Sequence, residues 1–223
     1  MVVSQNPKKT DNDMKIFTMK QNLIIILTFF ISVNLYSQNL DIDLLREINL
    51  NRNTKLDNTF RLITNSASPV SIATPLIIYS VGVINDDETI KKKGIYIAET
   101  FLVSAFISTG LKYSINRDRP FVTYPDLEKV TSGGSPSFPS GHTSEAFATA
   151  TSLSIAFPKW YVIAPSFLWA GAVGYSRMDL GVHYPSDVLV GAVCGFGSAY
   201  LTYKLNNWIN KKSKKGILYY GHN

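Results

Sequence analysis

The stretch Ser176–Asp187 reads S-R-M-D-L-G-V-H-Y-P-S-D and combines a cation, an imidazole and a carboxylate. Arg177 can neutralise an anion, and His183 can attack an electrophile or exchange a proton. Asp187 opens an apolar run four residues after His183, where it can fix the tautomer of the imidazole. Together these groups predict a catalytic anion site at the start of a helix.

Two further polar stretches come earlier in the chain, each at the end of an apolar segment. K-Y-S-I-N-R-D-R-P covers Lys112–Pro120, and six residues separate its first lysine from Arg119. S-F-P-S-G-H covers Ser137–His142 and stands directly before a helical pattern. Because all three stretches lie at ends of apolar segments, we expect their polar groups to converge on one site.

Length and charge narrow the class of protein. The 223 residues suit one domain with a sizeable core, and the formal net charge is +6. The lysines flank apolar segments, and aromatic and basic residues do not alternate on one face, so nucleic acid is not an expected partner. The single cysteine, Cys194, excludes an intrachain disulfide framework and is interpreted as a packing residue.

The N-terminus has the pattern of a targeting segment. Lysines precede the apolar run Leu23–Val33, whose length fits a signal-peptide core and falls short of the roughly 20 residues that span a bilayer. This pattern predicts a leader over residues 1–37 that is cleaved after Ser37. The alternative is an uncleaved anchor that extends to Tyr36. In both cases the following chain is exported.

Residues 38–64 are predicted to be an amphipathic exported segment. Its apolar residues recur at helical spacing in two sets, Ile42, Leu45 and Ile48, then Leu56, Phe60 and Ile63. This spacing predicts two short surface helices that pack on the rest of the protein. We see no chemistry in them.

Five apolar segments follow and predict an all-α helical bundle. They lie at about residues 65–84, 94–111, 144–157, 160–175 and 186–205. They are rich in Gly, Ala and Ser, which permit close contact between helices. The bundle is expected to form one domain over residues 65–209, followed by a basic tail over residues 210–223.

Two observations point in opposite directions on whether lipid or protein buries these helices. Several segments are short, Glu99 and Glu145 lie in or near two of them, and the mean hydropathy of the chain is low. Against this, lysine clusters follow the first segment, separate the third from the fourth and end the fifth. If the exported chain crosses five times, every cluster lies in the cytoplasm, as the positive-inside rule requires.

That threading favours five transmembrane helices in a bacterial inner membrane. It also places residues 112–142 and 176–183 together on the outer face, so the active site is expected to face the periplasm. The alternative is a soluble periplasmic protein with the same helices buried in protein.

The motifs K-x6-R-P, P-S-G-H and S-R-x5-H-x3-D resemble those of the type 2 phosphatidic acid phosphatase (PAP2) superfamily. That superfamily includes membrane lipid phosphatases, soluble bacterial acid phosphatases and vanadium haloperoxidases. The resemblance covers about residues 40–208 and implies a helical bundle of the PAP2 or acid phosphatase-haloperoxidase type. The matching residues are Lys112, Arg119 and Pro120, then Pro139–His142, then Ser176, Arg177, His183 and Asp187.

The resemblance implies a phosphate site built from cations and amide groups. A phosphate monoester carries a charge of about −2, and Lys112, Arg119 and Arg177 would bind its oxygens. Ser140 and Gly141 would present backbone N–H groups at the start of a helix. No metal or other cofactor is expected, because no second cluster of His, Asp or Glu has ligand spacing.

The resemblance also implies roles for the two motif histidines. His183 would be the nucleophile that forms a phosphohistidine, with its ring held by Asp187. His142 would be the general acid that protonates the leaving oxygen and later assists the attacking water. Arg117, next to the motif but outside it, is interpreted as part of a surface salt bridge.

Three other carboxylates near the motifs receive no catalytic role. Asp118 and Asp179 are interpreted as loop residues. Glu145, like Glu99, could face either a helix interface or a polar cavity.

The predicted function is metal-independent hydrolysis of a lipid phosphate or diphosphate at the outer face of the inner membrane. The Y-P-S-D-V run around Asp187 resembles the membrane branch of the superfamily. Candidate substrates implied by that branch are undecaprenyl diphosphate, phosphatidylglycerophosphate, phosphatidic acid and a lipid A phosphate. The alternatives are a soluble periplasmic non-specific acid phosphatase, a vanadium haloperoxidase and an inactive lipid-binding relative.

Overall fold

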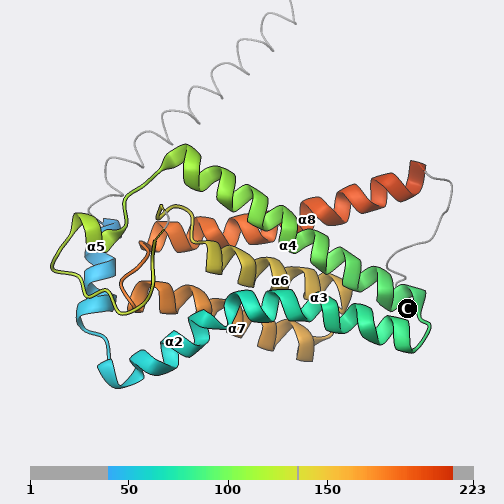
Figure 1. Cartoon of the computed structure of the whole chain (residues 1–223), viewed down its shortest axis with the longest axis horizontal. Helices are drawn as coiled ribbons and strands as arrows, with labels where there is room; N and C mark the ends of the chain where they lie inside the picture. The colour runs from blue at the N-terminus through green and yellow to red at the C-terminus, as the bar shows by residue number, and fades with distance from the viewer. Residues whose placement is uncertain (1–39, 135, 213–223) are drawn as a thin grey trace, which may run out of the picture. The chain divides into compact units, whose positions relative to one another are not determined.

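The computed structural model describes residues 40–134 and 136–212. The predicted leader, residues 1–37, lies outside this part of the chain, as does the predicted basic tail beyond Lys212. The chain divides into two compact units, Met1–Asp41 and Ile42–Asn223, and the second contains all three motifs. Every regular element among the described residues is a helix, which confirms the all-α class (Figure 1).

Five long helices form the bundle, and each overlaps one predicted apolar segment. They are α3 (Ala67–Ile84), α4 (Glu88–Ile115), α6 (Gly141–Ala156), α7 (Trp160–Asp179) and α8 (Pro185–Lys212). Shorter helices are η1 (Thr54–Leu56), α2 (Asp57–Asn65) and α5 (Pro120–Thr123), and residues 42–50 are also helical. Charged and polar residues extend α4 and α8 beyond the apolar segments that predicted them.

The limits of the helices place the motifs. Asp87 caps the start of α4, where its side chain accepts hydrogen bonds from the N–H groups of Thr89 and Ile90. At the other end Asn116 adopts the left-handed conformation, with φ of 50°, and stops the helix. Arg119 and its neighbours therefore leave the helix axis as a loop, which Pro120 ends by starting α5.

Helix α6 lies in contact with α3, α4, α7 and α8 (Figure 1). Small residues allow these contacts to be close. A Cβ atom added at Gly191 or Gly195 of α8 would lie 2.6 Å from a backbone oxygen of α6 or its N-cap. Because α8 packs directly on the backbone of α6, the first turns of the two helices, which carry His142 and Asp187, lie side by side.

Hydrogen bonds between helices account for both partly buried glutamates, Glu99 and Glu145. Glu145 of α6 accepts a 2.7 Å hydrogen bond from the hydroxyl of Ser68 in α3. Glu99 of α4 accepts one of 2.6 Å from the side chain of Asn206 in α8. Of the two alternatives left open by the sequence, a helix interface is the one observed for each.

Three stretches of the described residues are long and apolar enough to cross a membrane, Thr54–Ile84, Glu88–Thr123 and Pro185–Ile209. They contain α3, α4 and α8, whereas α6 and α7 are not among them. Large apolar side chains point outward from the bundle, as shown by Phe106 of α4, which is 81% exposed, and Leu168 of α7, which is 74% exposed. Such an apolar exterior is typical of helices that face lipid.

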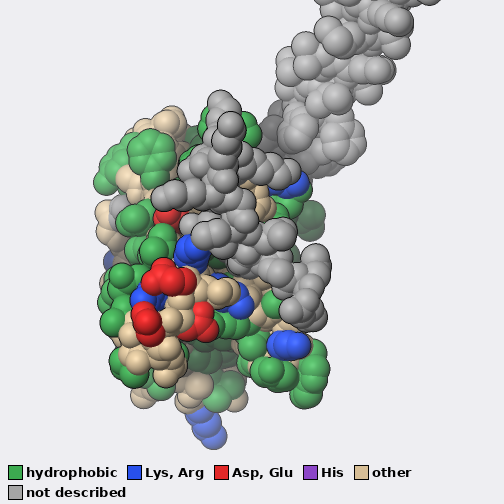
Figure 2. All heavy atoms as spheres, turned by 90° about the vertical axis from the view of Figure 1, so that its right-hand side faces the viewer, with side chains coloured by type: hydrophobic (Ala, Val, Ile, Leu, Met, Phe, Trp, Pro, Cys, Tyr) green, Lys and Arg blue, Asp and Glu red, His purple; other side chains and the backbone are tan. Residues whose placement is uncertain are grey.

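The end of the bundle at the α3–α4 turn is charged. Figure 2 shows acidic and basic side chains gathered at this end, with hydrophobic side chains around them. Lys91 forms ion pairs with Asp86 at 3.1 Å and with Glu88 at 2.8 Å. The lysine cluster that predicted the topology is therefore partly neutralised by its own neighbours.

The segment before α3 supports the opposite end of the bundle. Ile42 and Leu45 are buried against Leu127 and Tyr184. The side chain of Asn49 donates a 2.8 Å hydrogen bond to the carbonyl of Asp179 at the end of α7. This segment, in which the sequence revealed no chemistry, thus positions the chain on both sides of the third motif.

Candidate active site

The three motifs meet where α4 and α7 end and α6 and α8 begin (Figure 1). A cavity of about 180 Å³ lies between them. Its lining residues are Lys112, Arg119, Ser132, Gly133, Gly134, Gly141, His142, Arg177 and His183. Three of these have basic side chains and none carries a carboxylate, so the cavity attracts anions.

Lys112 lies in the last turn of α4 and ties the loop before α6 to that helix. Its ammonium donates to the carbonyls of Pro136 at 2.7 Å and Pro139 at 2.9 Å. An ammonium has three donors, so one remains for a phosphate oxygen in the cavity.

Arg119 contacts one ring nitrogen of His183 and so indicates the tautomer. Its Nη1 atom lies 2.7 Å from the carbonyl of Val182 and 3.2 Å from His183 Nε2. A guanidinium can only donate, so Nε2 accepts with its lone pair and the ring proton is on Nδ1. The nitrogen that carries the lone pair is therefore the one that faces the cations.

His183 is 1% exposed and lies on the loop between α7 and α8. Its Nδ1 atom is 3.3 Å from Asp187 Oδ2, the same oxygen that accepts from the N–H of Tyr184 at 3.0 Å and from the hydroxyl of Ser137. Burial lowers the pKa of His183 to about 3. The charges of Arg177 and Arg119 also lower it, whereas the hydrogen bond to Asp187 raises it. The imidazole is therefore neutral and nucleophilic at pH 7.

Arg177 is a buried cation with an unused donor. It is 2% exposed, and its guanidinium donates to the hydroxyl of Thr64 at 2.7 Å and to the carbonyl of Ser132 at 3.3 Å. Its Nε atom has no hydrogen-bond partner among the described residues. Because a buried charge without a counterion is unfavourable, an anion in the cavity would stabilise this arrangement.

His142 lies in the first turn of α6, before the apolar part of that helix, and is partly buried. No side chain among the described residues forms a hydrogen bond with its ring. The pKa of His142 is lowered to about 4, mainly by burial and then by the positive charges of Arg177, Arg119 and Lys112. A bound phosphate would offset these three charges and so oppose the part of the shift that they cause.

Ser140 and Gly141 have different positions relative to the cavity. Gly141 lines the cavity. The N–H of Ser140 donates instead to the carbonyl of Asp187 at 3.0 Å, and its hydroxyl is 2.8 Å from that of Thr143. The amide predicted to contact phosphate at Ser140 is therefore occupied in linking α6 to α8, because the two helices approach so closely.

Arg117 lies in a different environment from the surface salt bridge that was expected. Its Nη1 atom is 2.9 Å from Asp187 Oδ1 and 2.8 Å from the hydroxyl of Ser186, and its guanidinium lies 3.7 Å from the ring centre of Tyr184. Asp187 is fully buried. Sequence reasoning also missed Ser137, although its place two residues before P-S-G-H was a possible signal.

Two carboxylates interpreted as loop residues have different positions. Asp118 is exposed in the loop after α4, as expected. Asp179 is the last residue of α7 and is 2% exposed. Neither lines the cavity.

A glycine pair that sequence reasoning did not single out makes room for Arg119. A Cβ atom at Gly133 would lie 2.8 Å from Arg119 Nη1, whereas one at Gly134 would meet nothing within 4 Å. Only the first glycine is therefore required by the packing of the arginine. The S-G-G-S run was its only sequence signal.

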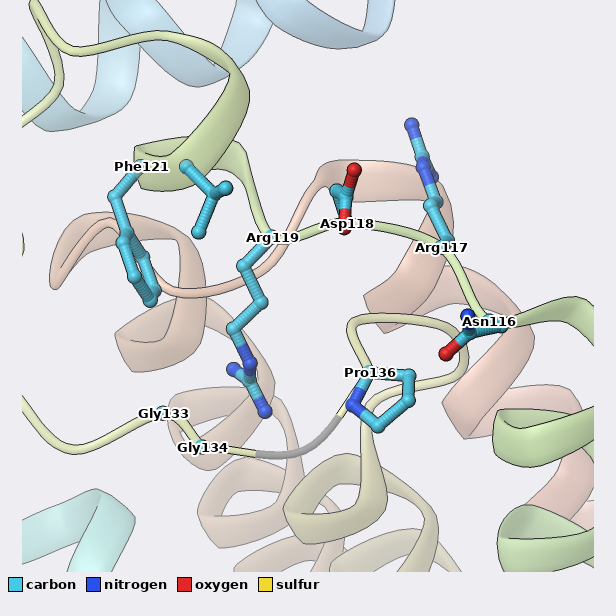
Figure 3. A pocket seen from close by; sticks show the side chains of 9 residues that line it. Asn116, Arg117, Asp118, Arg119, Phe121, Gly133, Gly134 and Pro136 are labelled. Carbon is cyan, nitrogen blue, oxygen red and sulfur yellow. The ribbon is translucent and has the colours of Figure 1, made fainter.

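A second cavity of about 310 Å³ adjoins the first and shares Arg119, Gly133 and Gly134 with it. Figure 3 shows Arg119 and Phe121 directed toward the glycine pair, while Arg117 points away from it. The remaining lining residues are Asn116, Arg117, Asp118, Val122 and Pro136. This mixed polar and apolar space can hold a group larger than phosphate beside the cationic cavity. Within the described residues, no three His, Cys, Asp or Glu side chains gather as a metal site.

Residues 93–211 match the PAP2 superfamily. An undecaprenyl-diphosphatase of Sulfolobus acidocaldarius is 26% identical over 194 residues, which cover 83% of this chain and 88% of that protein. A lipid A 1-phosphatase of Rhizobium etli is 32% identical over 115 residues, 49% of this chain and 48% of that protein.

The fold is also similar to that of a solved structure. A transmembrane PAP2-type phosphatidylglycerolphosphate phosphatase of Bacillus subtilis superposes with a TM-score of 0.68 at 25% identity, over 84% of this chain and 96% of that one. The family match covers the three motifs and the helices that carry them. The chain therefore belongs to the PAP2 superfamily, as one of its membrane phosphatases.

Proposed function

We propose that this protein hydrolyses a lipid phosphate or diphosphate without a metal ion, through a phosphohistidine at His183. The observation that carries the proposal is the orientation of His183 Nε2, whose lone pair faces a cavity surrounded by Lys112, Arg119 and Arg177. A neutral imidazole with a defined tautomer beside three cations is suited to attack a phosphorus atom in line.

In the first step a phosphate group enters the cavity and takes hydrogen bonds from the cations. Arg119 then exchanges His183 Nε2 for phosphate oxygens, which frees the lone pair for attack. The N–P bond forms as the bond from phosphorus to the leaving oxygen breaks. His142 donates a proton to that oxygen, and Asp187 stabilises the positive charge on the ring of His183.

In the second step water hydrolyses the phosphohistidine. His142, now neutral, takes a proton from the water as its oxygen attacks phosphorus. The N–P bond breaks, the electron pair returns to Nε2, and inorganic phosphate leaves. The enzyme returns to its starting protonation state.

The substrate class follows from the relatives and from the surroundings of the site. The named activities of the relatives concern undecaprenyl diphosphate, lipid A and phosphatidylglycerolphosphate, which share a phosphate group on a lipid. The site is at one end of helices whose outer faces are apolar. A lipid in the bilayer would bring its headgroup to this depth.

We further propose that all five long helices cross the inner membrane and that the site faces the periplasm. Helix α6 is surrounded by four other helices, so it needs little apolar surface of its own to cross a bilayer. The placement of lysine clusters at the end opposite the site supports the orientation.

The test is phosphate release by the full chain in carbonate-washed membranes, with a chelator present. The substrates are undecaprenyl diphosphate, lipid A 1-phosphate, phosphatidylglycerophosphate and p-nitrophenyl phosphate. We expect membrane-bound activity that favours a lipid. Activity in the wash on p-nitrophenyl phosphate alone would instead identify a soluble acid phosphatase, and vanadate-dependent bromination would identify a haloperoxidase.

Orientation is tested separately with a variant in which the single cysteine is removed, Cys194→Ala. One new cysteine is placed either in the α3–α4 turn or in the loop before α6. A membrane-impermeant maleimide added to intact cells with a permeable outer membrane should label only the second. Labelling of the first alone would reverse the proposed orientation.

A further inference from the structure

Arg117 contacts Asp187, whose other carboxylate oxygen lies 3.3 Å from the ring of His183, and it lines the second cavity. Figure 3 shows its side chain directed away from Arg119 and the glycine pair. Its guanidinium contacts the first turn of α8, where it pairs with Asp187 Oδ1 at 2.9 Å and with the hydroxyl of Ser186 at 2.8 Å. It does not line the cavity that is surrounded by Lys112, Arg119 and Arg177.

Arg117 also connects all three motifs. Its carbonyl accepts a 2.8 Å hydrogen bond from the N–H of Ser137, and the hydroxyl of Ser137 donates to Asp187. The carbonyl of Asp187 in turn accepts from the N–H of Ser140 at 3.0 Å. These hydrogen bonds form a closed ring that joins the loop after α4, the loop before α6 and the start of α8.

The ring determines which oxygen of Asp187 faces the imidazole. Oδ1 accepts from Arg117, whereas Oδ2 accepts from His183 Nδ1, from the N–H of Tyr184 and from the hydroxyl of Ser137. Without Arg117 the buried Oδ1 would lose its charged partner, and the carboxylate could rotate about its Cβ–Cγ bond to recover one. Rotation would weaken the contact with Nδ1 and allow the ring proton to move to Nε2, where it would block the nucleophilic lone pair.

The burial of Asp187 makes this contact stronger than an ordinary surface ion pair. Its side chain is 0% exposed, whereas that of Arg117 is 28% exposed. A hydrogen-bonded pair with a buried carboxylate is little screened by solvent, and its geometry is restrained further by the ring of Tyr184, 3.7 Å from the guanidinium carbon.

We propose that Arg117 is a positioning residue that holds the carboxylate of Asp187 in the orientation that keeps the lone pair of His183 on Nε2. The inference rests on the proposed function, in which His183 is the nucleophile. Arg117 lines the second cavity but not the cationic one, so its loss should slow the chemical step much more than it weakens substrate binding.

The experiment compares the variants Arg117→Ala and Arg117→Lys with the wild-type full chain in detergent. Arg46→Ala is the matched control, because Arg46 pairs with Asp126 at 2.8 Å and lies 5.1 Å from the ring centre of Tyr124, away from the histidine. For Arg117→Ala we expect kcat to fall by about 10- to 100-fold, the usual range for a residue that orients another, with KM changed less than about threefold.

Two comparisons separate a positioning role from general damage to the fold. Arg117→Lys should retain an intermediate kcat, because an ammonium can pair with Asp187 but cannot form the planar fork. Added guanidinium ion should restore part of kcat in Arg117→Ala, but not in His183→Ala. An unchanged kcat in Arg117→Ala, or an equal loss in Arg46→Ala, would overturn the inference.

A second readout does not depend on turnover. The chain has three histidines, so ¹⁵N spectra of histidine-labelled protein can resolve each ring, and His183→Ala assigns the relevant signals. Wild type should show one tautomer, with the proton on Nδ1, and Arg117→Ala a mixture of both. The same single tautomer in both proteins would refute the positioning role. Lack of phosphate release by wild type would refute the proposed function, and the spectra would still decide the role of Arg117.

Discussion

The two histidines of the site face one cavity but have different surroundings. His183 is buried, and Arg119, Asp187 and their partners restrain both of its ring nitrogens. His142 is partly buried at the start of α6, and the described residues provide no hydrogen bond to its ring. The difference matches two chemical needs. A nucleophile must keep one tautomer, whereas a general acid must gain and lose a proton during each turnover.

The same positive charges act on both rings. Burial and the cations lower the pKa of each, but only His183 has a carboxylate that opposes the effect. A phosphate dianion bound in the cavity would offset these charges. In the proposed mechanism this matters most for His142, to which the described residues provide no hydrogen-bonded carboxylate.

The largest effect is expected for His183→Ala. Removing the nucleophile should lower kcat by about 10⁴-fold or more, because no other described side chain can take its place at the cavity. Phosphate affinity, measured by calorimetry with inorganic phosphate, should remain, since the three cations are unchanged. Turnover near the wild-type level would show that the nucleophile lies elsewhere.

His142→Ala should reduce activity in proportion to how poor the leaving group is. For a lipid monophosphate, whose leaving group is an alkoxide, we expect a loss of about 10²- to 10⁴-fold. The loss should be much smaller with p-nitrophenyl phosphate, whose leaving group needs no proton. Initial rates on the two substrates, compared within one preparation, test this, and equal losses on both would contradict the acid role.

Gly133→Ala should disturb the His183 side of the cavity without touching either histidine. The new Cβ atom would lie 2.8 Å from Arg119 Nη1, so the guanidinium must shift away from the phosphate. We expect KM to rise by about tenfold, or roughly 1.4 kcal/mol of binding free energy. The control is Gly134→Ala, where the space is open. A similar change in both variants would point to altered loop flexibility instead.

The smallest expected effect is a difference between two pH profiles. His142 must be protonated to act as acid, so activity is present below its pKa and is lost as the pH rises through it. The profile of kcat/KM reports the free enzyme, in which that pKa is low, and the profile of kcat reports the complex, in which phosphate raises it. The basic limb of kcat should therefore lie at higher pH than that of kcat/KM, and should be absent in His142→Ala. If the basic limbs of the two profiles coincide, bound substrate does not raise the pKa of His142.

The sequence by itself determined the helical class, the five long helices and most of the residues that line the cationic cavity. Periodicity and apolar runs are local properties, and the motif residues Lys112, Arg119, His142, Arg177 and His183 all reach the cavity. Residue type and spacing sufficed, because each motif stands at the end of its helix and those ends meet.

Only the tertiary structure decided how these residues are held. Arg117 and Asp187 are 70 positions apart, and Arg177 and Thr64 are 113 apart, so no local pattern could pair them. The N–H of Ser140 is occupied because α8 packs against the backbone of α6, a contact set by glycines of another helix. The tautomer of His183 likewise depends on Arg119 from a distant loop. Residue types define which chemistry is possible, and contacts between remote helices define the orientation in which it occurs.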